Sequence, residues 1–130
     1  MVKRQNISEW FDMQKDFIFI LLGLIVGILA SFTGLGGGFL MVPLLLFLGY
    51  DAQKSVGTSF MAIVVISISA LFAHSKLKNV DYRVGILLGI GGIIGAQIGA
   101  RLLEHVPTDT FKKIFAIILF LLALRMFLKR

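Results

Sequence analysis

The sequence predicts an all-α integral membrane protein, and composition and hydropathy patterning both support this prediction. Hydrophobic residues make up 58% of the 130 residues, and charged residues make up only 15%. Four long apolar stretches lack Asp, Glu, Lys and Arg, which is typical of segments that cross a bilayer core, where roughly 20 residues are needed. A soluble domain of this length could not bury so much apolar surface.

Composition also excludes several chemistries. The chain has no cysteine, so a disulfide framework, a thiolate metal site and a thiol nucleophile are excluded. No nucleophile, metal cluster or carboxylate pair converges in the spans, which argues against an enzyme, and we expect no cofactor. The 13 Lys and Arg residues lie at the edges of the apolar runs, so we expect membrane-interface anchors and no binding of nucleic acid.

The first segment, residues 1–16, is polar but has a helical pattern. Trp10, Met13 and Phe17 recur at i, i+3 and i+7, which predicts a short helix on the membrane surface. A signal peptide is the alternative, although the hydrophobic sequence continues well beyond Phe17. We expect an N-terminal interfacial segment followed by one transmembrane unit over residues 17–130.

The first apolar stretch, residues 17–48, is too long for one crossing, because as one helix it would extend about 48 Å. Residues 34–38 contain four glycines, and each costs about 1 kcal/mol relative to alanine inside a helix. We therefore expect the helix to break at Gly34–Gly38 and a second half-helix to start at Gly37–Phe39.

A helix break inside a bilayer predicts a binding site. Unpaired backbone groups are tolerated there only where protein covers them or water lines them. The start of the second half-helix offers free N–H groups and a positive dipole end, which suit an anion, and glycine lets these amides approach a ligand. Buried carboxylates are missing from the spans, which argues against a cation site. The alternative is a kink that serves only helix packing.

A second span is expected from Asp51, which has the character of a helix N-cap, to Ala73. Thr58 and Ser59 follow Gly57 in its early turns, where a hydroxyl can face a cavity built by the broken segment. The alternative is that these hydroxyls bond to their own helix or to a neighbouring one, as is common in membrane helices.

The next segment, His74–Arg83, is expected to be a polar loop outside the membrane. Its first residue, His74, belongs to the residue type that changes charge near neutral pH, which makes it a candidate for proton coupling. The alternative is an interfacial residue that ends the second span.

The third span, Val84–Leu103, contains Gly91, Gly95 and Gly99 at a spacing of four residues. Small residues at this spacing let another backbone approach closely, so we expect a packing helix in the centre of a bundle. Gln97 is a candidate either for substrate contact or for a bridge between helices.

The fourth span, Thr110–Leu128, follows a helix-start signal at Pro107-Thr108-Asp109. Its body is apolar on every side, which favours contact with lipid or with a partner subunit.

Two topologies are open, and they place the positive residues differently. If the broken helix passes straight through the membrane, nine positive residues share one side and four the other, which fixes the orientation. The nine are Lys3, Arg4, Lys15, Lys76, Lys78, Arg83, Arg125, Lys129 and Arg130. If the break is the tip of a re-entrant hairpin, the split is seven to six, which permits both orientations. The seven are Lys3, Arg4, Lys15, Lys54, Arg101, Lys112 and Lys113. Length favours the hairpin, and charge favours the straight break.

Several motifs resemble those of the sulfite exporter TauE/SafE family, in order and in spacing. They are residues 34–43 (GLGGGFLMVP), residues 57–59 (GTS), His74 before a loop with Val80-Asp81, and residues 95–100 (GAQIGA). The resemblance covers residues 17–130. Members of this family usually carry two such repeats and this chain carries one, so the resemblance implies half of a two-repeat transporter fold: four main transmembrane helices with the first region broken into two half-helices.

The resemblance also implies a function, namely membrane transport, as an exporter, of small sulfur-containing anions such as sulfite or organosulfonates. We expect neutral donors to hold the anion, because neutral donors also release it again. The expected substrate-binding residues are Gly34, Gly36, Gly37, Gly38, Phe39, Thr58, Ser59 and Gln97.

One repeat cannot enclose a central site, so we expect a homodimer in the cell membrane that works by alternating access. The two copies would be antiparallel in the hairpin topology and parallel with a straight break. Two alternative functions remain open: a passive anion channel, and a non-catalytic subunit of a hetero-oligomeric membrane complex.

Overall fold

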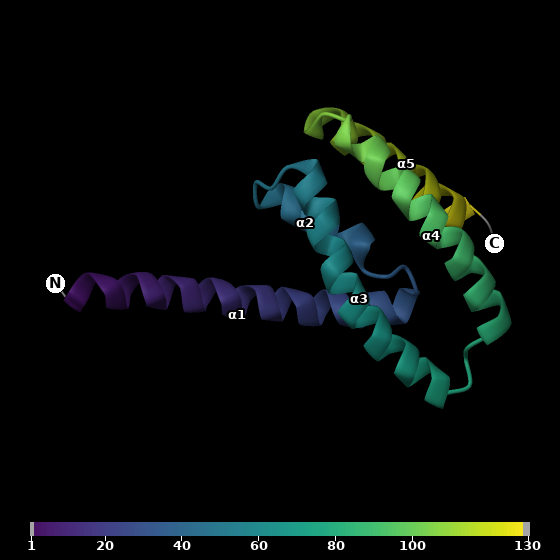
Figure 1. Cartoon of the computed structure of the whole chain (residues 1–130), viewed down its shortest axis with the longest axis horizontal. Coiled ribbons are helices and arrows are strands. Elements are labelled where there is room, and N and C mark those ends of the chain that lie inside the picture. The colour runs from purple at the N-terminus through teal and green to yellow at the C-terminus, as the bar shows by residue number, and fades with distance from the viewer. Residues whose placement is uncertain (1, 129–130) are drawn as a thin grey trace.

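A computed structural model of the chain describes the backbone of residues 2–128 and the side chains of residues 13–128. Its described secondary structure is entirely helical, as the sequence predicts (Figure 1). The helices are α1 (Val2–Thr33), α2 (Gly38–Phe47), α3 (Ala52–Lys76), α4 (Tyr82–Glu104) and α5 (Thr108–Leu128). Residues 2–16 form one continuous helix with the rest of α1, and the expected interfacial role of residues 1–16 stays a prediction.

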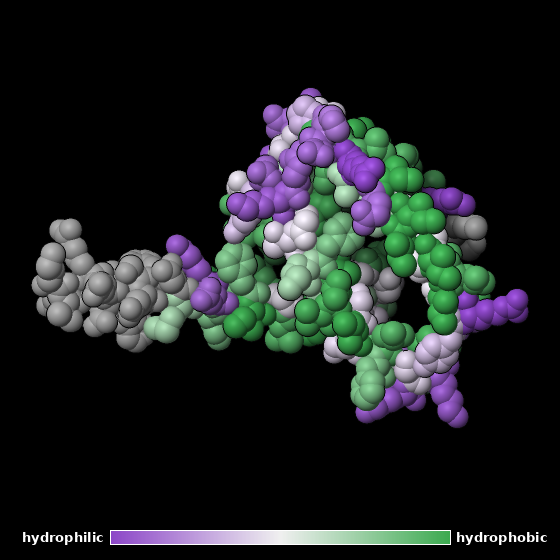
Figure 2. Space-filling view, viewed as in Figure 1, coloured by the Kyte–Doolittle hydropathy of each residue, from purple (hydrophilic) through white to green (hydrophobic). Residues whose placement is uncertain are grey.

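Three helices within the described residues are long and apolar enough to cross a membrane: Met13–Thr33, Ala52–Lys76 and Tyr82–Glu104. The fourth expected span forms α5, a helix of 21 residues with Lys112, Lys113 and Arg125 near its ends, and its crossing stays a prediction. Figure 2 shows hydrophilic residues gathered at the top and the bottom of the view, with a few more at its left and right edges, and a large apolar surface between them.

The ends of α3 explain its length. At its start, the side chain of Asp51 accepts a hydrogen bond from the N–H of Lys54 at 2.8 Å, so the expected N-cap is confirmed. At its end, Lys78 has a left-handed φ of 58°, and the N–H of Asn79 donates to the carbonyl of His74 at 3.0 Å. This is the Schellman arrangement that closes a helix. The expected polar loop from His74 is therefore wrong at its start, because His74 lies in the last turn of α3.

The chain reverses its direction at the glycine break. A Cβ placed on Gly37 would lie 3.1 Å from Cγ1 of Val26 and 3.2 Å from Cβ of Ala30, so the start of α2 packs back against α1. If α2 continued along α1, Gly37 would lie about 10 Å beyond Ala30. The glycine break is therefore the tip of a hairpin in the chain.

The core of the molecule lies around α2. Three of the ten residues of this helix are buried, namely Met41, Val42 and Leu45. Val26 of α1 forms a buried cluster with Met41 and Leu45 of α2. The face of α3 that carries Ala52, Ser55 and Ser59 is also buried. Its small side chains let another helix approach closely, which in lipid replaces the hydrophobic driving force.

The turn between α4 and α5 is tied to the start of α3. The hydroxyl of Thr108 accepts a hydrogen bond from the N–H of Ala52 at 3.1 Å. The side-chain amide of Gln53 donates to the carbonyls of Leu103 and Val106, at 3.1 and 2.9 Å. Elsewhere α4 and α5 lie apart from the core, and no residue that the structure describes in either helix is buried.

Candidate functional site

The glycine break separates α1 from α2 by four residues, as the sequence predicts. Gly34, Gly36 and Gly37 have φ values of 71°, 71° and 76°, in the left-handed region where side chains are strained. Gly37 is the N-cap of α2, so the predicted start of the half-helix is confirmed. The break thus has a conformation that requires glycine at three positions.

The start of α2 presents unpaired amides. Among the described residues, none accepts a hydrogen bond from the N–H groups of Gly36, Gly37, Gly38 or Phe39. These groups carry the positive end of the helix dipole. In a membrane they need an acceptor from water, a ligand or another chain.

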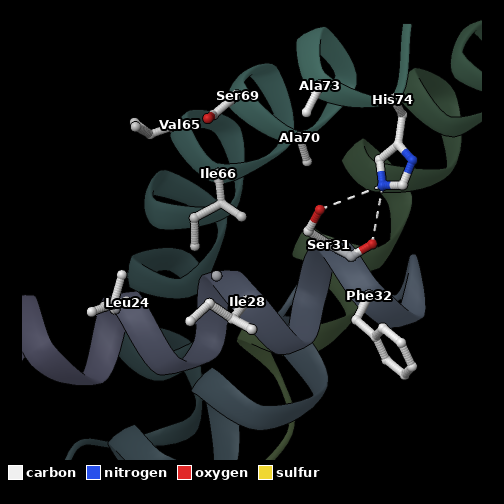
Figure 3. A pocket seen from close by; sticks show the side chains of 12 residues that line it. Leu24, Ile28, Ser31, Phe32, Val65, Ile66, Ser69, Ala70, Ala73 and His74 are labelled. Carbon is white, nitrogen blue, oxygen red and sulfur yellow. Dashed lines mark hydrogen bonds between the residues drawn. The ribbon is translucent and has the colours of Figure 1, made fainter. Parts of the chain in front are cut away.

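The end of α1 is held by a side chain from α3. Nε2 of His74 lies 3.1 Å from the main-chain oxygen of Ser31 and 3.4 Å from its hydroxyl. A carbonyl oxygen can only accept, so Nε2 carries the hydrogen. The last carbonyls of a helix have no partner within that helix, and His74 supplies one for α1 (Figure 3).

A pocket of about 210 Å³ lies between the break and α3. Because a water molecule occupies about 30 Å³, the pocket has room for a small anion and some of its water. Its lining residues come from the end of α1, the break and α3, and they are Ala30, Ser31, Gly34, Gly36, Ile66, Ser67, Ala70, Leu71 and His74. We call this space the break pocket.

A larger and more apolar groove of about 690 Å³ runs along α1 and α3. It shares Ser31, Ile66, Ala70 and His74 with the break pocket, so the two spaces meet at the hydrogen bond between His74 and Ser31 (Figure 3). Neither space is lined, within the described part of the chain, by Asp, Glu, Lys or Arg. Polar character there comes from hydroxyls, backbone groups and one imidazole.

The structure brings only some of the predicted site residues together. Gly34 and Gly36 line the break pocket with His74. Gly37 is buried against α1, and Gly38 faces α3, where an added Cβ would lie 3.0 Å from Cδ1 of Ile63.

The other predicted site residues lie elsewhere in the single chain. Thr58 is exposed, Ser59 is buried with its hydroxyl donating to the carbonyl of Val56 at 2.8 Å, and Gln97 is exposed on α4. Ser59 thus has the intrahelical hydrogen bond that the sequence left open as an alternative.

Two polar residues of the break pocket, Ser31 and Ser67, were not predicted from the sequence. Ser67 lies seven residues before His74, with Ala70 between them, and this spacing places all three on one face of a helix. That periodicity was the available signal. Ser31 gave no comparable signal, because only the reversal at the break brings it to α3.

The glycines of α4 have no neighbour in the chain. A Cβ on Gly91, Gly95 or Gly99 would meet nothing within 4 Å among the described residues. The expected central position of this helix is therefore not found within one chain, and packing of this face stays a prediction for an assembly. Gln97 follows Gly95 by two residues, about 200° around the helix, and so lies on a different face.

The helical fold, the apolar spans and the reversed, broken helix define a multi-pass membrane protein. A family model for the sulfite exporter TauE/SafE matches residues 19–130. The chain belongs to this family, as the motifs of the sequence indicate.

Curated relatives are named as transporters. The chain is similar to the probable membrane transporter protein YunE of Bacillus subtilis, 36% identical over 120 residues, which are 86% of this chain and 44% of the relative. It is similar to the probable membrane transporter protein MJ0441 of Methanocaldococcus jannaschii, 34% identical over 110 residues, 78% of this chain and 41% of the relative. The chain thus spans less than half the length of these relatives. No solved structure matches it.

Proposed function

We propose that this chain carries small sulfur-containing anions, such as sulfite or organosulfonates, across the cell membrane by alternating access, in the direction of export. The observation that carries the proposal is the break pocket, where Gly34 and Gly36 of the break lie together with the hydroxyl residues Ser31 and Ser67 and with His74. The family description and the transporter names of the relatives support the reaction class.

The donors in this region suit an anion that must be released again. Backbone amides of the break and the hydroxyls of Ser31 and Ser67 are neutral, and no fixed cation lines the pocket within the described residues. Neutral donors replace the hydration of the anion without the strong attraction of a buried arginine. Sulfonate and sulfite oxygens accept hydrogen bonds of this kind.

The active assembly is a homodimer in this proposal. α4 and α5 have no buried residue in their described parts, and a Cβ on Gly91, Gly95 or Gly99 would meet nothing within 4 Å among the described residues. A second copy would cover these helices and the open side of the break pocket. Thr58 and Gln97, which are exposed in one chain, are then available to the assembly.

The two copies are antiparallel in this proposal. The reversal at Gly37 and the contact between Ser31 and His74 place the ends of α1 and α3 together, which fits the hairpin topology. Positive residues then split seven to six between the two sides, so that the chain can insert in both orientations. Inverted copies that meet at the bilayer midplane form a known transporter plan.

The test is counterflow of labelled sulfite into proteoliposomes that contain only this chain, with sulfoacetate, sulfate and chloride as competitors. We expect counterflow that sulfoacetate blocks. Flux without counterflow would indicate a passive channel instead. Absence of flux from a folded protein would indicate a subunit that needs an unlike partner chain.

A further inference from the structure

We propose that His74 takes up one proton when the break pocket binds its anion, so that anion and proton cross together. This inference rests on the proposed anion pocket and adds the coupling ion and the residue that carries it. It starts from an electrostatic need. An anion that enters a pocket in an apolar protein loses hydration, and the part of this cost that neutral donors do not offset falls when a positive charge accompanies the anion.

His74 is the one side chain lining the break pocket that can supply this charge, among the residues that the structure describes. Imidazole changes its charge near neutral pH, whereas the serine hydroxyls of the lining stay neutral. A charge on His74 lies at the junction of the pocket and the groove, because the residue lines both. The anion therefore has its counter-charge at the wall of the pocket.

The hydrogen bond of His74 is compatible with either charge state. Nε2 donates to the carbonyl of Ser31 at 3.1 Å, and the neutral and the charged ring can both make this bond. The bond becomes stronger when the donor is charged. Ser31 lies in the last turn of α1, where the negative end of the helix dipole favours a cation. Protonation therefore requires no rotation of the ring.

Among the described residues, no Asp, Glu, Lys or Arg lines the break pocket beside His74, and Asp81 in the turn after α3 accepts a hydrogen bond from the N–H of Val84 at 3.0 Å. In the described part of α1, Lys15 and Asp16 lie 15 or more residues before Ser31, about 22 Å along the helix. α2 has no ionisable residue. On α3, Lys76 follows His74 by two residues, and its Nζ lies 4.5 Å from the centre of the Phe72 ring. His74 is thus the group that responds to an anion in the pocket.

The proton balance gives a measurable consequence. If the bound form holds one proton more than the free form, the affinity for the anion is greatest at low pH. As the pH rises, this affinity falls by up to about tenfold per pH unit. The coupling also makes transport of a monoanion electroneutral, so that an imposed pH gradient drives the anion toward the less acidic side.

The second histidine provides a matched control. His105 also donates to a carbonyl near a helix end, from Nδ1 to Arg101 at 3.0 Å, but it is exposed and lines neither space. His74→Gln keeps a side-chain N–H that can donate to the carbonyl of Ser31 but cannot take up a proton. His105→Gln removes the other imidazole without touching the pocket.

The experiment uses the chain of 130 residues in proteoliposomes and a labelled alkylsulfonate, whose charge is constant between pH 5 and 9. For the wild type and His105→Gln we expect affinity to fall about tenfold per pH unit over part of this range, and a pH gradient to drive accumulation. For His74→Gln we expect an affinity that does not change with pH and is no higher than that of the wild type at high pH, and we expect no accumulation. A pH-sensitive dye inside wild-type vesicles reports the proton flux directly, without any substitution.

The outcomes separate this inference from the proposed function. Counterflow with a flat profile in the wild type, or an unchanged pH dependence in His74→Gln, would overturn the proton proposal and leave the carrier intact. Loss of the pH dependence in His105→Gln would also overturn it. No counterflow in the wild type would refute the carrier and the proton proposal together.

Discussion

His74 of α3 donates a hydrogen bond from Nε2 to the main-chain oxygen of Ser31 in the last turn of α1, across 3.1 Å. This bond joins two helix ends that are 43 residues apart in the sequence. A straight-through broken helix would place Ser31 in the middle of the membrane and His74 near one surface. The contact therefore agrees with the hairpin geometry at the glycine break and places an imidazole at the wall of the break pocket.

Loss of this bond should loosen the end of α1. We expect His74→Ala to lower the free energy of unfolding by about 1 kcal/mol, the value of one partly buried hydrogen bond. His105→Ala should cost less, because its bond is exposed and lies within its own helix end. Denaturant titration in detergent, followed by tryptophan fluorescence, measures both variants. Equal losses would show that the hydrogen bond between the helices adds no more stability than the exposed bond of His105.

Gly37 and Gly34 form a pair that separates backbone strain from packing. Both have left-handed φ values, so alanine at either position costs about 1–2 kcal/mol of strain. At Gly37 the new Cβ would also lie 3.1 Å from Val26, whereas at Gly34 it would meet nothing within 4 Å. We expect Gly37→Ala to be less stable than Gly34→Ala by a further 1 kcal/mol or so. The same denaturant titration checks this order, and the reverse order would exclude the reversed packing at the break.

Ser67 and Ser59 distinguish a pocket hydroxyl from a buried one. Ser67→Ala should weaken anion binding about fivefold, which corresponds to one lost hydrogen bond of about 1 kcal/mol. Ser59→Ala should leave the affinity nearly unchanged, because its hydroxyl bonds to Val56 of its own helix. Competition in the counterflow assay gives both affinities. A larger effect at Ser59 would place the site about two turns nearer the start of α3.

We expect the glycine face of α4 to pack against another chain and not within its own chain. Gly95→Leu adds a side chain where nothing lies within 4 Å, so the single chain should fold normally while the dimer is weakened. Ile90→Phe, on another side of the helix, is the control for added bulk. Light scattering of the detergent-solubilised protein gives the ratio of dimer to monomer. An unchanged ratio for Gly95→Leu would remove this face from the interface.

The helices were largely predictable because their signals are local. The glycine run ended α1, Asp51 capped α3, and Pro107 preceded α5, as their positions in the sequence indicate. The end of α3 was misplaced by three residues, because hydropathy falls at His74 while the closing turn forms at Lys78. A Schellman turn with lysine in the left-handed region has no clear sequence signal.

The site was predictable only where it depends on backbone. The glycine break follows from composition, and Gly34 and Gly36 line the pocket as expected. The hydroxyl residues of the pocket could not be predicted. The reversal of the chain decides which face of α3 meets the break, and the sequence has no local signal for it. Thr58 and Ser59 lie at the start of α3, the helix that follows the broken segment. Ser59 is buried in the structure, and the pocket forms about two turns further along α3, at Ser67.

Protection of Ser67→Cys from a small thiol reagent tests the central claim, that the break pocket binds the anion, most directly. The chain has no native cysteine, so the reaction reports one position. We expect an alkylsulfonate to slow the modification of Ser67→Cys in proteoliposomes, with no effect on Asn79→Cys in the exposed turn after α3. An unchanged rate at Ser67→Cys, or protection found instead at Thr58→Cys, would contradict the account.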